Sequence, residues 1–113
     1  MEIKIIIDPR TSTITLKGSL DISNAAVFEE QFKKIASHKP RAVGIDLNEV
    51  DNIDSSGIGA VVKMYNLLKN SGGEFILYGM NSRIMTVFQG AGLYRFFKIL
   101  TNEEFQKKYL VSG

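Results

Sequence analysis

The chain has 113 residues, of which 44% are hydrophobic and 23% charged, and its net charge is +2 at neutral pH. This composition is that of an ordinary globular domain and excludes a disordered, fibrous or membrane chain. The sequence contains no cysteine, so disulfides, thiolate metal sites and cysteine nucleophiles are also excluded. We expect a single domain that spans residues 1–113.

The basic residues are scattered along the chain rather than gathered in a stripe, which argues against direct binding of DNA or RNA. No apolar stretch approaches the ~18 residues needed to cross a bilayer. The residues after Met1 lead straight into a strand-like run and lack the pattern of a secretion signal. We therefore expect a cytoplasmic protein with no membrane partner.

The first part of the chain predicts a β-hairpin, a helix and a buried strand. Residues 3–7 and 13–17 are strand-like runs, and residues 8–11 between them have turn chemistry. From about residue 23 to residue 37, apolar side chains recur at helical spacing with charged side chains between them. Residues 42–47 form a short, mostly apolar run that is typical of a strand covered on both faces.

The second part of the chain predicts three more helices and two more strands. The first is a helix that ends at residues 71–73 and has an apolar stripe of Ile58, Val61, Val62, Tyr65 and Leu68. A strand at residues 74–78 follows, and then a helix that is capped by Asn81 or Ser82 and ended by residues 90–92. The last two elements are a strand at residues 96–100 and a short helix through Phe105 and Tyr109. Thr101 and Glu104 have the spacing of a capping box at the start of the last helix.

The predicted order is β-β-α-β-α-β-α-β-α, which indicates an α/β fold. Its sheet is mixed and mostly parallel, is opened by the β-hairpin, and is accompanied by about four helices. In open sheets of this kind, the loops at the carboxyl ends of the strands form the functional edge. We expect the loop after Gly18, a loop from Asn48 to Ser56 and the turn at residues 79–82 to meet at that edge.

The most informative segment is Asp54-Ser55-Ser56-Gly57-Ile58-Gly59, which separates a buried strand from an amphipathic helix. The first amides of a helix lack intrahelical partners, so Asp54 or Ser55 can cap it, and the helix dipole favours an anion at the same place. This position can therefore carry a phosphate on Ser55 without loss of the fold. The simpler interpretation is that these residues only cap the helix.

The glycines of this segment have two interpretations. Gly57 and Gly59 allow either the backbone of a partner or the protein's own sheet to come close to the helix. Ile58 between them offers an apolar contact.

The sequence completes no catalytic or metal-binding constellation. His38 is the only histidine and lies in a predicted loop, so no triad or histidine metal site can be assembled around a second one. Residues 57–59 resemble the start of a dinucleotide fingerprint, but Val62 occupies the place of its third glycine. The acids between residues 46 and 54 lack the spacing of a calcium loop. We predict a protein that is not an enzyme and has no metal or cofactor.

The segment at residues 54–59 resembles the signature of the anti-sigma factor antagonists, bacterial proteins that share the STAS fold with the tails of sulfate transporters. The resemblance covers nearly the whole chain. Residues 18–21 are similar to the family's Gly-x-Leu-Asp turn, residues 72–74 to the step into its fourth strand, and residues 91–97 to its closing Gly-Leu-x-x-x-Phe segment.

This resemblance implies partner switching. An unmodified antagonist binds an anti-sigma factor that is also a serine kinase and thereby frees a sigma factor; phosphorylation of the family's serine ends the complex, and a serine phosphatase restores it. The matching serine is Ser55, and Ser56 takes the second hydroxyl position. The expected partner-binding residues are Asp21, Asp54, Ser55, Ser56, Gly57, Ile58, Gly59, Met80, Asn81 and Ser82.

Two alternatives stay open. The domain is a non-catalytic scaffold or accessory subunit of a stress-sensing or transporter complex, or it is a sensor that binds a nucleotide or another anion at the helix amides. The lack of any Lys or Arg between Arg41 and Lys63 argues against strong phosphate binding. The charge mechanism requires that the Ser55 hydroxyl be exposed and that residues 48–54 not continue a strand.

Overall fold

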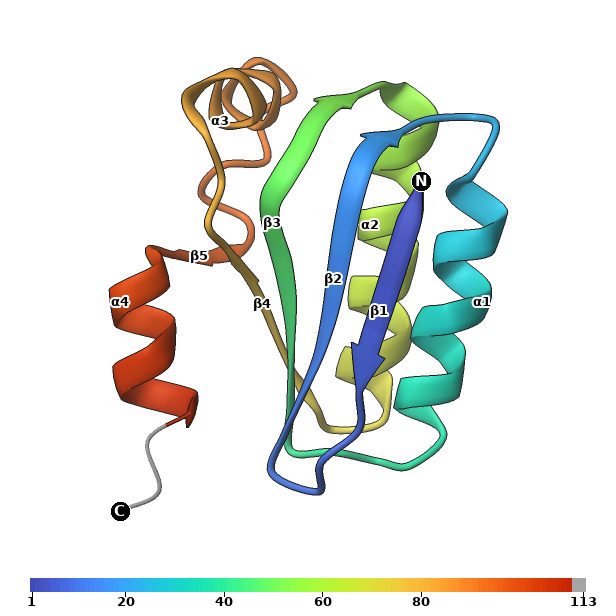
Figure 1. Ribbon diagram of the computed structural model, residues 1–113, viewed down its shortest axis with the longest axis vertical. Coiled ribbons are helices and arrows are strands. Elements are labelled where there is room, and N and C mark those ends of the chain that lie inside the picture. The colour runs from blue at the N-terminus through green and yellow to red at the C-terminus, as the bar shows by residue number, and fades with distance from the viewer. Residues whose placement is uncertain (111–113) are drawn as a thin grey trace.

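The computed structural model describes residues 1–110, which form one five-stranded sheet of order β1-β2-β3-β4-β5 (Figure 1). The strands are β1 (Glu2–Ile6), β2 (Thr11–Leu20), β3 (Ala42–Ile53), β4 (Glu74–Tyr78) and β5 (Lys98–Leu100). β1 is antiparallel to β2, and every other neighbouring pair is parallel. The predicted mixed sheet, opened by a hairpin, is confirmed.

The helices are α1 (Ala25–Ala36), α2 (Ser55–Asn70), α3 (Ser82–Gly90) and α4 (Asn102–Phe105), and a π-helical turn η1 (Gln106–Leu110) continues α4. α1, α2 and α3 pack on one face of the sheet, and α4 packs on the other (Figure 1). Because each parallel crossover returns on the same face, the strand order grows in one direction. α1 begins after the predicted residue 23 because the Asn24 side chain closes a turn on the Asp21 amide at 2.9 Å.

The main core lies between the sheet and the helices α1, α2 and α3. α1 buries Phe28, Phe32 and Ile35, as its spacing predicts. The buried face of α2 is rotated about the helix axis relative to the predicted apolar stripe. It consists of Gly57, Ala60, Val61, Met64 and Leu68. The predicted Ile58, Val62 and Tyr65 lie at its margin and are half-buried. Gly57 and Ala60 are too small to mark the buried side in a hydrophobicity pattern.

A second, smaller core fixes α4 to the opposite face of the sheet. It contains Ala42, Ile76, Tyr78 and Phe105, and the rings of Tyr78 and Phe105 stack with centroids 3.9 Å apart. The predicted capping box begins this helix: Thr101 Oγ1 accepts from the Glu104 amide, and Glu104 Oε1 accepts from the Thr101 amide. A four-residue helix is therefore held by packing and by both hydrogen bonds of its capping box.

The predicted loop from Asn48 to Ser56 is wrong, because β3 continues to Ile53. The apolar residues of this extension are three positions apart, at Leu47, Val50 and Ile53, and all are buried. A regular strand buries every second residue, so this spacing does not look like a strand in the sequence.

Two bulges explain the unusual spacing. The pairing of β2 with β3 passes from Thr15↔Asp46 to Lys17↔Glu49, and again from Gly18↔Val50 to Ser19↔Asn52. At each step β3 contains one residue more than β2, and such a bulge reorients the side chains that follow it. The bulges thereby turn each apolar residue of the extension towards the core and lead the chain to the start of α2.

Candidate functional site

Asp54 caps α2, as predicted, and also joins the helix to the turn that follows β2. Its Oδ1 accepts from the Gly57 amide at 2.9 Å, and its Oδ2 accepts from the Ile22 amide at 3.3 Å. The Asp54 amide donates to the Leu20 carbonyl oxygen at 3.3 Å. The turn after β2 and the start of α2, which belong to two of the three segments that the sequence predicts at this edge, therefore do meet, through one carboxylate.

Replacing Asp54 by Ala is expected to lower the free energy of unfolding by about 1 kcal/mol, because both amides lose their acceptor. Asn is an equally good N-cap, so Asp54→Asn should keep the bond to the Gly57 amide and lose only the longer bond to the Ile22 amide, because the Asn NH2 group cannot accept. Urea unfolding of the two variants and the parent measures the difference. Equal losses in both variants would contradict a capping role.

Ser55 is the first residue of α2, and it is exposed. Its hydroxyl makes no hydrogen bond to any part of the chain between residues 1 and 110, whereas the neighbouring Ser56 is half-buried. A modifying enzyme can therefore reach the Ser55 oxygen in the folded protein. The helix amides and dipole at this position favour a negative charge.

One of the two requirements of the charge mechanism is met. The Ser55 side chain is exposed, but the strand does continue through the preceding segment and ends at Ile53. The requirement on residues 48–54 therefore fails, and the mechanism rests on the exposure of Ser55. The strand ends one residue before Asp54, so the serine still lies at the carboxyl edge of the sheet.

The turn at Asp21 carries a second carboxylate at this edge. Asp21 Oδ1 accepts from the Ser23 amide at 2.9 Å and from the Ser23 hydroxyl. The hydroxyl, followed by the amide, lowers the pKa of Asp21 below its usual value. With Asp54 close by, the edge around Ser55 is acidic before any modification.

Ile22 is a residue of this edge that the sequence reasoning missed. Its side chain is 79% exposed, and its amide is bound to Asp54. A signal was present, because a large apolar residue directly follows the Asp of the turn and fits no helical or strand stripe. A single exposed apolar residue is common on protein surfaces, so it is the link to Asp54, the residue before Ser55, that places Ile22 at this edge.

The two glycines of the segment have different roles. A Cβ atom on Gly57 would lie 2.2 Å from the Leu20 carbonyl oxygen, so the buried Gly57 allows α2 to sit on the end of β2. The expectation that Gly57 admits a partner's backbone is therefore wrong. A Cβ atom on Gly59 would meet nothing within 4 Å, and Gly59 is exposed, so this position is open to a partner. Ile58 between them is half-buried against the core.

The turn at Met80, Asn81 and Ser82 reaches the same edge of the sheet through β3. Asn81 Oδ1 caps α3 by accepting from the Ile84 amide, and its Nδ2 donates to the Val50 carbonyl oxygen at 3.0 Å. Met80 is half-buried against the core, and Ser82 is exposed. Within residues 1–110, no hydrogen bond or ion pair connects this turn to Ser55. Asn81 therefore has a structural role that the sequence assigned only in part.

A comparison with the sequence models of protein families decides the family of this chain. The family model of the STAS domain matches residues 2–105. The chain belongs to the STAS domain family. The resemblance inferred from the sequence is confirmed, and so is the fold expected from it.

The relatives of this STAS domain include anti-sigma factor antagonists. It is 29% identical over 80 residues to the anti-sigma-B factor antagonist of Listeria monocytogenes, an alignment that covers 71% of this chain and 70% of the relative. Among solved structures, the anti-sigma factor antagonist SpoIIAA in its unphosphorylated form superposes with a TM-score of 0.79 at 21% identity, over 99% of this chain and 100% of that one. The Bacillus SpoIIAA in its phosphorylated form gives 0.71 at 22% identity, over 95% and 98%.

A hollow of about 440 Å³ lies at the carboxyl ends of β4 and β5 of this STAS domain, and it does not include the N-terminus of α2. Its lining residues are Asn48, Gly79, Met80, Asn81, Met85, Tyr94, Ile99, Leu100, Thr101, Asn102 and Glu104. None of these side chains is basic. The hollow therefore lacks the cations that usually hold a nucleotide's phosphates, and the free helix amides beside Ser55 do not open into it.

Over the described part of the STAS domain, residues 1–110, no cluster of three or more His, Asp or Glu side chains is placed to bind a metal ion. No helix in that range has the length and apolar character needed to cross a bilayer. His38, the only histidine, is an exposed turn residue.

Proposed function

We propose that this protein is a cytoplasmic anti-sigma factor antagonist that works by partner switching. Its unmodified form binds a serine-kinase anti-sigma factor and releases the sigma factor, and phosphorylation of Ser55 ends the binding until a serine phosphatase removes the phosphate. The observation that carries this proposal is the exposed Ser55 hydroxyl at the first turn of α2, on the edge formed by Asp21, Ile22 and Asp54. The protein acts by binding, without catalysis of its own.

The relatives support this role. Those with curated names include antagonists of anti-sigma-B and anti-sigma F factors. SpoIIAA, which has the same fold, has been solved in both phosphorylated and unphosphorylated forms. A fold that survives the modification in a relative is what the placement of Ser55 at a helix N-terminus leads us to expect here.

The proposed switch acts through the charge of the surface. A phosphate adds roughly −1.5 to −2 charge at neutral pH. On this edge it joins the carboxylates of Asp21 and Asp54, so a partner that fits closely against it meets repulsion and a charge that it must desolvate. The helix N-terminus tolerates the same charge. Binding is therefore lost while the fold is kept.

The contact itself combines apolar and open positions. Ile22 is the exposed apolar side chain next to the serine, and Ile58 adds a half-exposed one on the first turns of α2. Gly59 leaves the helix surface open to a partner's backbone. A central apolar anchor beside the modified residue makes the added charge most effective, because the charge is then fully desolvated in the complex.

The two alternative functions make different predictions. A nucleotide or anion sensor requires a cavity at the α2 amides, and the hollow at this edge neither contains them nor presents a basic side chain. A scaffold role is compatible with the same fold, but it requires no modification of Ser55. Phosphorylation of the protein by its kinase partner therefore separates a scaffold from a switch.

The direct test incubates the full chain with ATP and the serine-kinase anti-sigma factor from its own genome, followed by mass spectrometry of residues 54–63. We expect one phosphate, on Ser55, which the matching phosphatase removes. Ser55→Ala should not be labelled, and the control Ser56→Ala should be. No labelling with an active kinase would favour the scaffold, and saturable nucleotide binding without the kinase would favour the sensor.

A further inference from the structure

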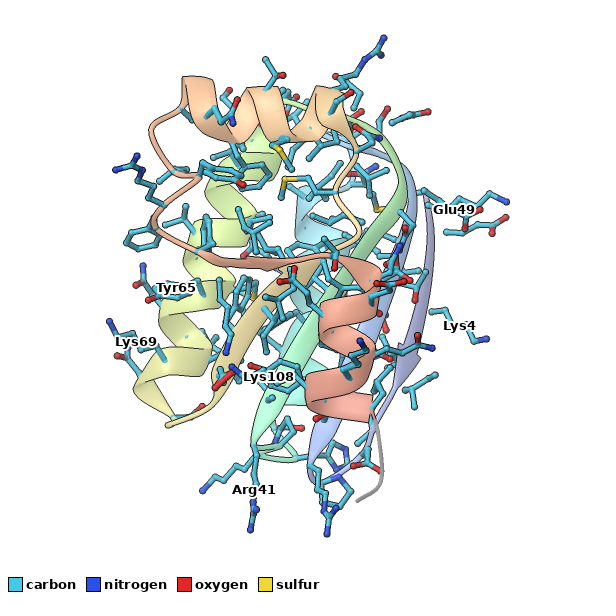
Figure 2. All side chains as sticks on the ribbon, turned by 90° about the vertical axis from the view of Figure 1, so that its left-hand side faces the viewer. Lys4, Arg41, Glu49, Tyr65, Lys69 and Lys108 are labelled. Carbon is cyan, nitrogen blue, oxygen red and sulfur yellow. The ribbon has the colours of Figure 1, made fainter. Side chains whose placement is uncertain are left out.

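A second surface lies at the other end of α2, around a hollow of about 280 Å³. We call it the aromatic–lysine patch and define it by Tyr65 and Lys69 of α2, Phe96, Lys98 of β5 and Lys108 of η1. Figure 2 shows Tyr65 and Lys69 on one side of the molecule, with Lys4 and Glu49 on the other. The hollow itself is lined by Tyr65, Lys69, Gly73, Glu74, Phe75, Phe96 and Lys98.

The aromatic rings of the patch are fixed although they reach the surface. Phe96 is 49% exposed, yet its ring lies 4.9 Å from that of Tyr65 and 5.0 Å from that of Phe97, centroid to centroid. Tyr65 also meets the ring of Phe75 edge-on. An exposed ring costs solvation free energy, and a ring held in one position loses little entropy when it is covered. These are the properties of an anchor for a bound apolar group.

The ammonium groups of the patch exceed its carboxylates. Lys69 Nζ lies 5.6 Å from the centroid of the Tyr65 ring. Lys98 donates to Glu74 Oε1 at 3.0 Å, and Glu74 is the only carboxylate among the described residues that line the hollow. Lys98 and Lys108 both lie within 6 Å of the Tyr109 ring, at 5.2 and 5.8 Å. The neighbouring Lys98 lowers the pKa of Lys108, so a bound anion relieves an existing repulsion between the two ammonium groups.

We propose that the aromatic–lysine patch is a docking surface for an acidic peptide segment that carries one large apolar side chain. The apolar side chain packs against Phe96 and Tyr65, and the carboxylates pair with Lys69 and Lys108. A peptide fits better than a nucleic acid, because a phosphate backbone needs a row of cations along several phosphates, whereas here a few lysines surround one hollow.

This docking surface is independent of the proposed switch. Lys69 follows Ser55 along the same helix, and at 1.5 Å per residue the two lie about 21 Å apart. That separation is more than twice the Debye length of about 8 Å, the distance over which physiological salt screens surface charges. A phosphate on Ser55 therefore leaves the affinity of the patch unchanged, and a partner bound to the patch stays bound when Ser55 is phosphorylated.

The test uses the full chain and a fluorescein-labelled octapeptide of Asp and Glu with one Phe, followed by fluorescence anisotropy at low and physiological salt. We expect saturable binding that salt weakens. Lys69→Glu and Phe96→Ser should each lower the affinity about tenfold or more. Lys4→Glu makes the same charge change on the other side of the molecule and should have no effect, nor should Ser55→Asp.

Three results would overturn the proposal. The first is equal loss of affinity in Lys69→Glu and Lys4→Glu, which shows attraction by net charge alone. The second is equal binding of a peptide in which Ser replaces the Phe, which shows that no apolar anchor is used. The third is tighter, Lys69-dependent binding of a thymidine oligonucleotide, which assigns the patch to nucleic acid. Because Lys69 is an exposed helix residue, its variant tests the proposal even if Phe96→Ser is destabilised.

Discussion

Ser55→Asp is expected to weaken binding of the serine-kinase anti-sigma factor by about 3 kcal/mol, roughly a hundredfold in the dissociation constant. The added carboxylate lies at the proposed docking edge beside Asp54 and Asp21, and it must be desolvated when the partner closes over it. Ser55→Ala adds no charge and should bind within about threefold of the parent. Isothermal titration calorimetry with the purified kinase measures both constants.

Loss of binding through added charge can be distinguished from loss of binding through unfolding. A helix N-terminus favours negative charge, so Ser55→Asp should have the same circular dichroism spectrum as the parent and an equal or higher unfolding midpoint. Ile22→Ser provides a matched surface change without charge and should also weaken binding, because it removes the exposed apolar anchor. Tight binding by the Asp variant would exclude the charge mechanism, whatever the kinase does to Ser55.

The features that the sequence predicts well are those fixed by residues near one another in the chain. Asp54 caps α2 and Thr101 forms a capping box with Glu104, because a cap needs only the amides two or three residues ahead. The buried stripe of α1 follows from helical spacing in the same way. The hairpin and the order of strands and helices are local as well, which explains why the fold class follows from the sequence.

The features that escaped prediction depend on residues distant in the sequence. The extension of β3 beyond Leu47 exists because β2 pairs with it across two bulges, and nothing in residues 48–53 alone encodes that partner. The place of Ile22 beside the start of α2 also depends on Asp54, which accepts from the Ile22 amide across 32 residues of sequence. Likewise, no local pattern shows that Phe96 is held beside Tyr65 at the far end of α2.

Gly57 shows how such a distant contact sets the position of the serine. The Leu20 carbonyl oxygen at the end of β2 occupies the space of a side chain at Gly57, and the same oxygen accepts from the Asp54 amide. The same backbone oxygen therefore fixes both the close packing of α2 on the end of β2 and the residue at which the helix begins. Ser55 is presented at the edge because the residue two positions later has no side chain.

Gly57→Ala is accordingly expected to lower the free energy of unfolding by about 3 kcal/mol. The new Cβ atom would lie 2.2 Å from a backbone oxygen and 2.8 Å from Ile53 Cγ1, so the helix must move away from the strand and the Asp54 contacts must lengthen. Gly59→Ala is the matched control, because it makes the same change two residues further along α2, where the new Cβ atom would lie in open space. It should stabilise the protein by about 0.5–1 kcal/mol through helix propensity alone.

Urea unfolding of both variants measures these opposite changes, and kinase binding separates their effects on function. Gly57→Ala should weaken binding in proportion to the fraction of molecules in which α2 is displaced, and a bound partner should restore part of its stability. Gly59→Ala should leave Ser55 in place, so weaker binding by this more stable variant would show that a partner's backbone packs against the open position. If Gly57→Ala is as stable as Gly59→Ala, the close contact of Gly57 with the Leu20 carbonyl oxygen does not position the helix, and the exposure of Ser55 at the sheet edge needs another cause.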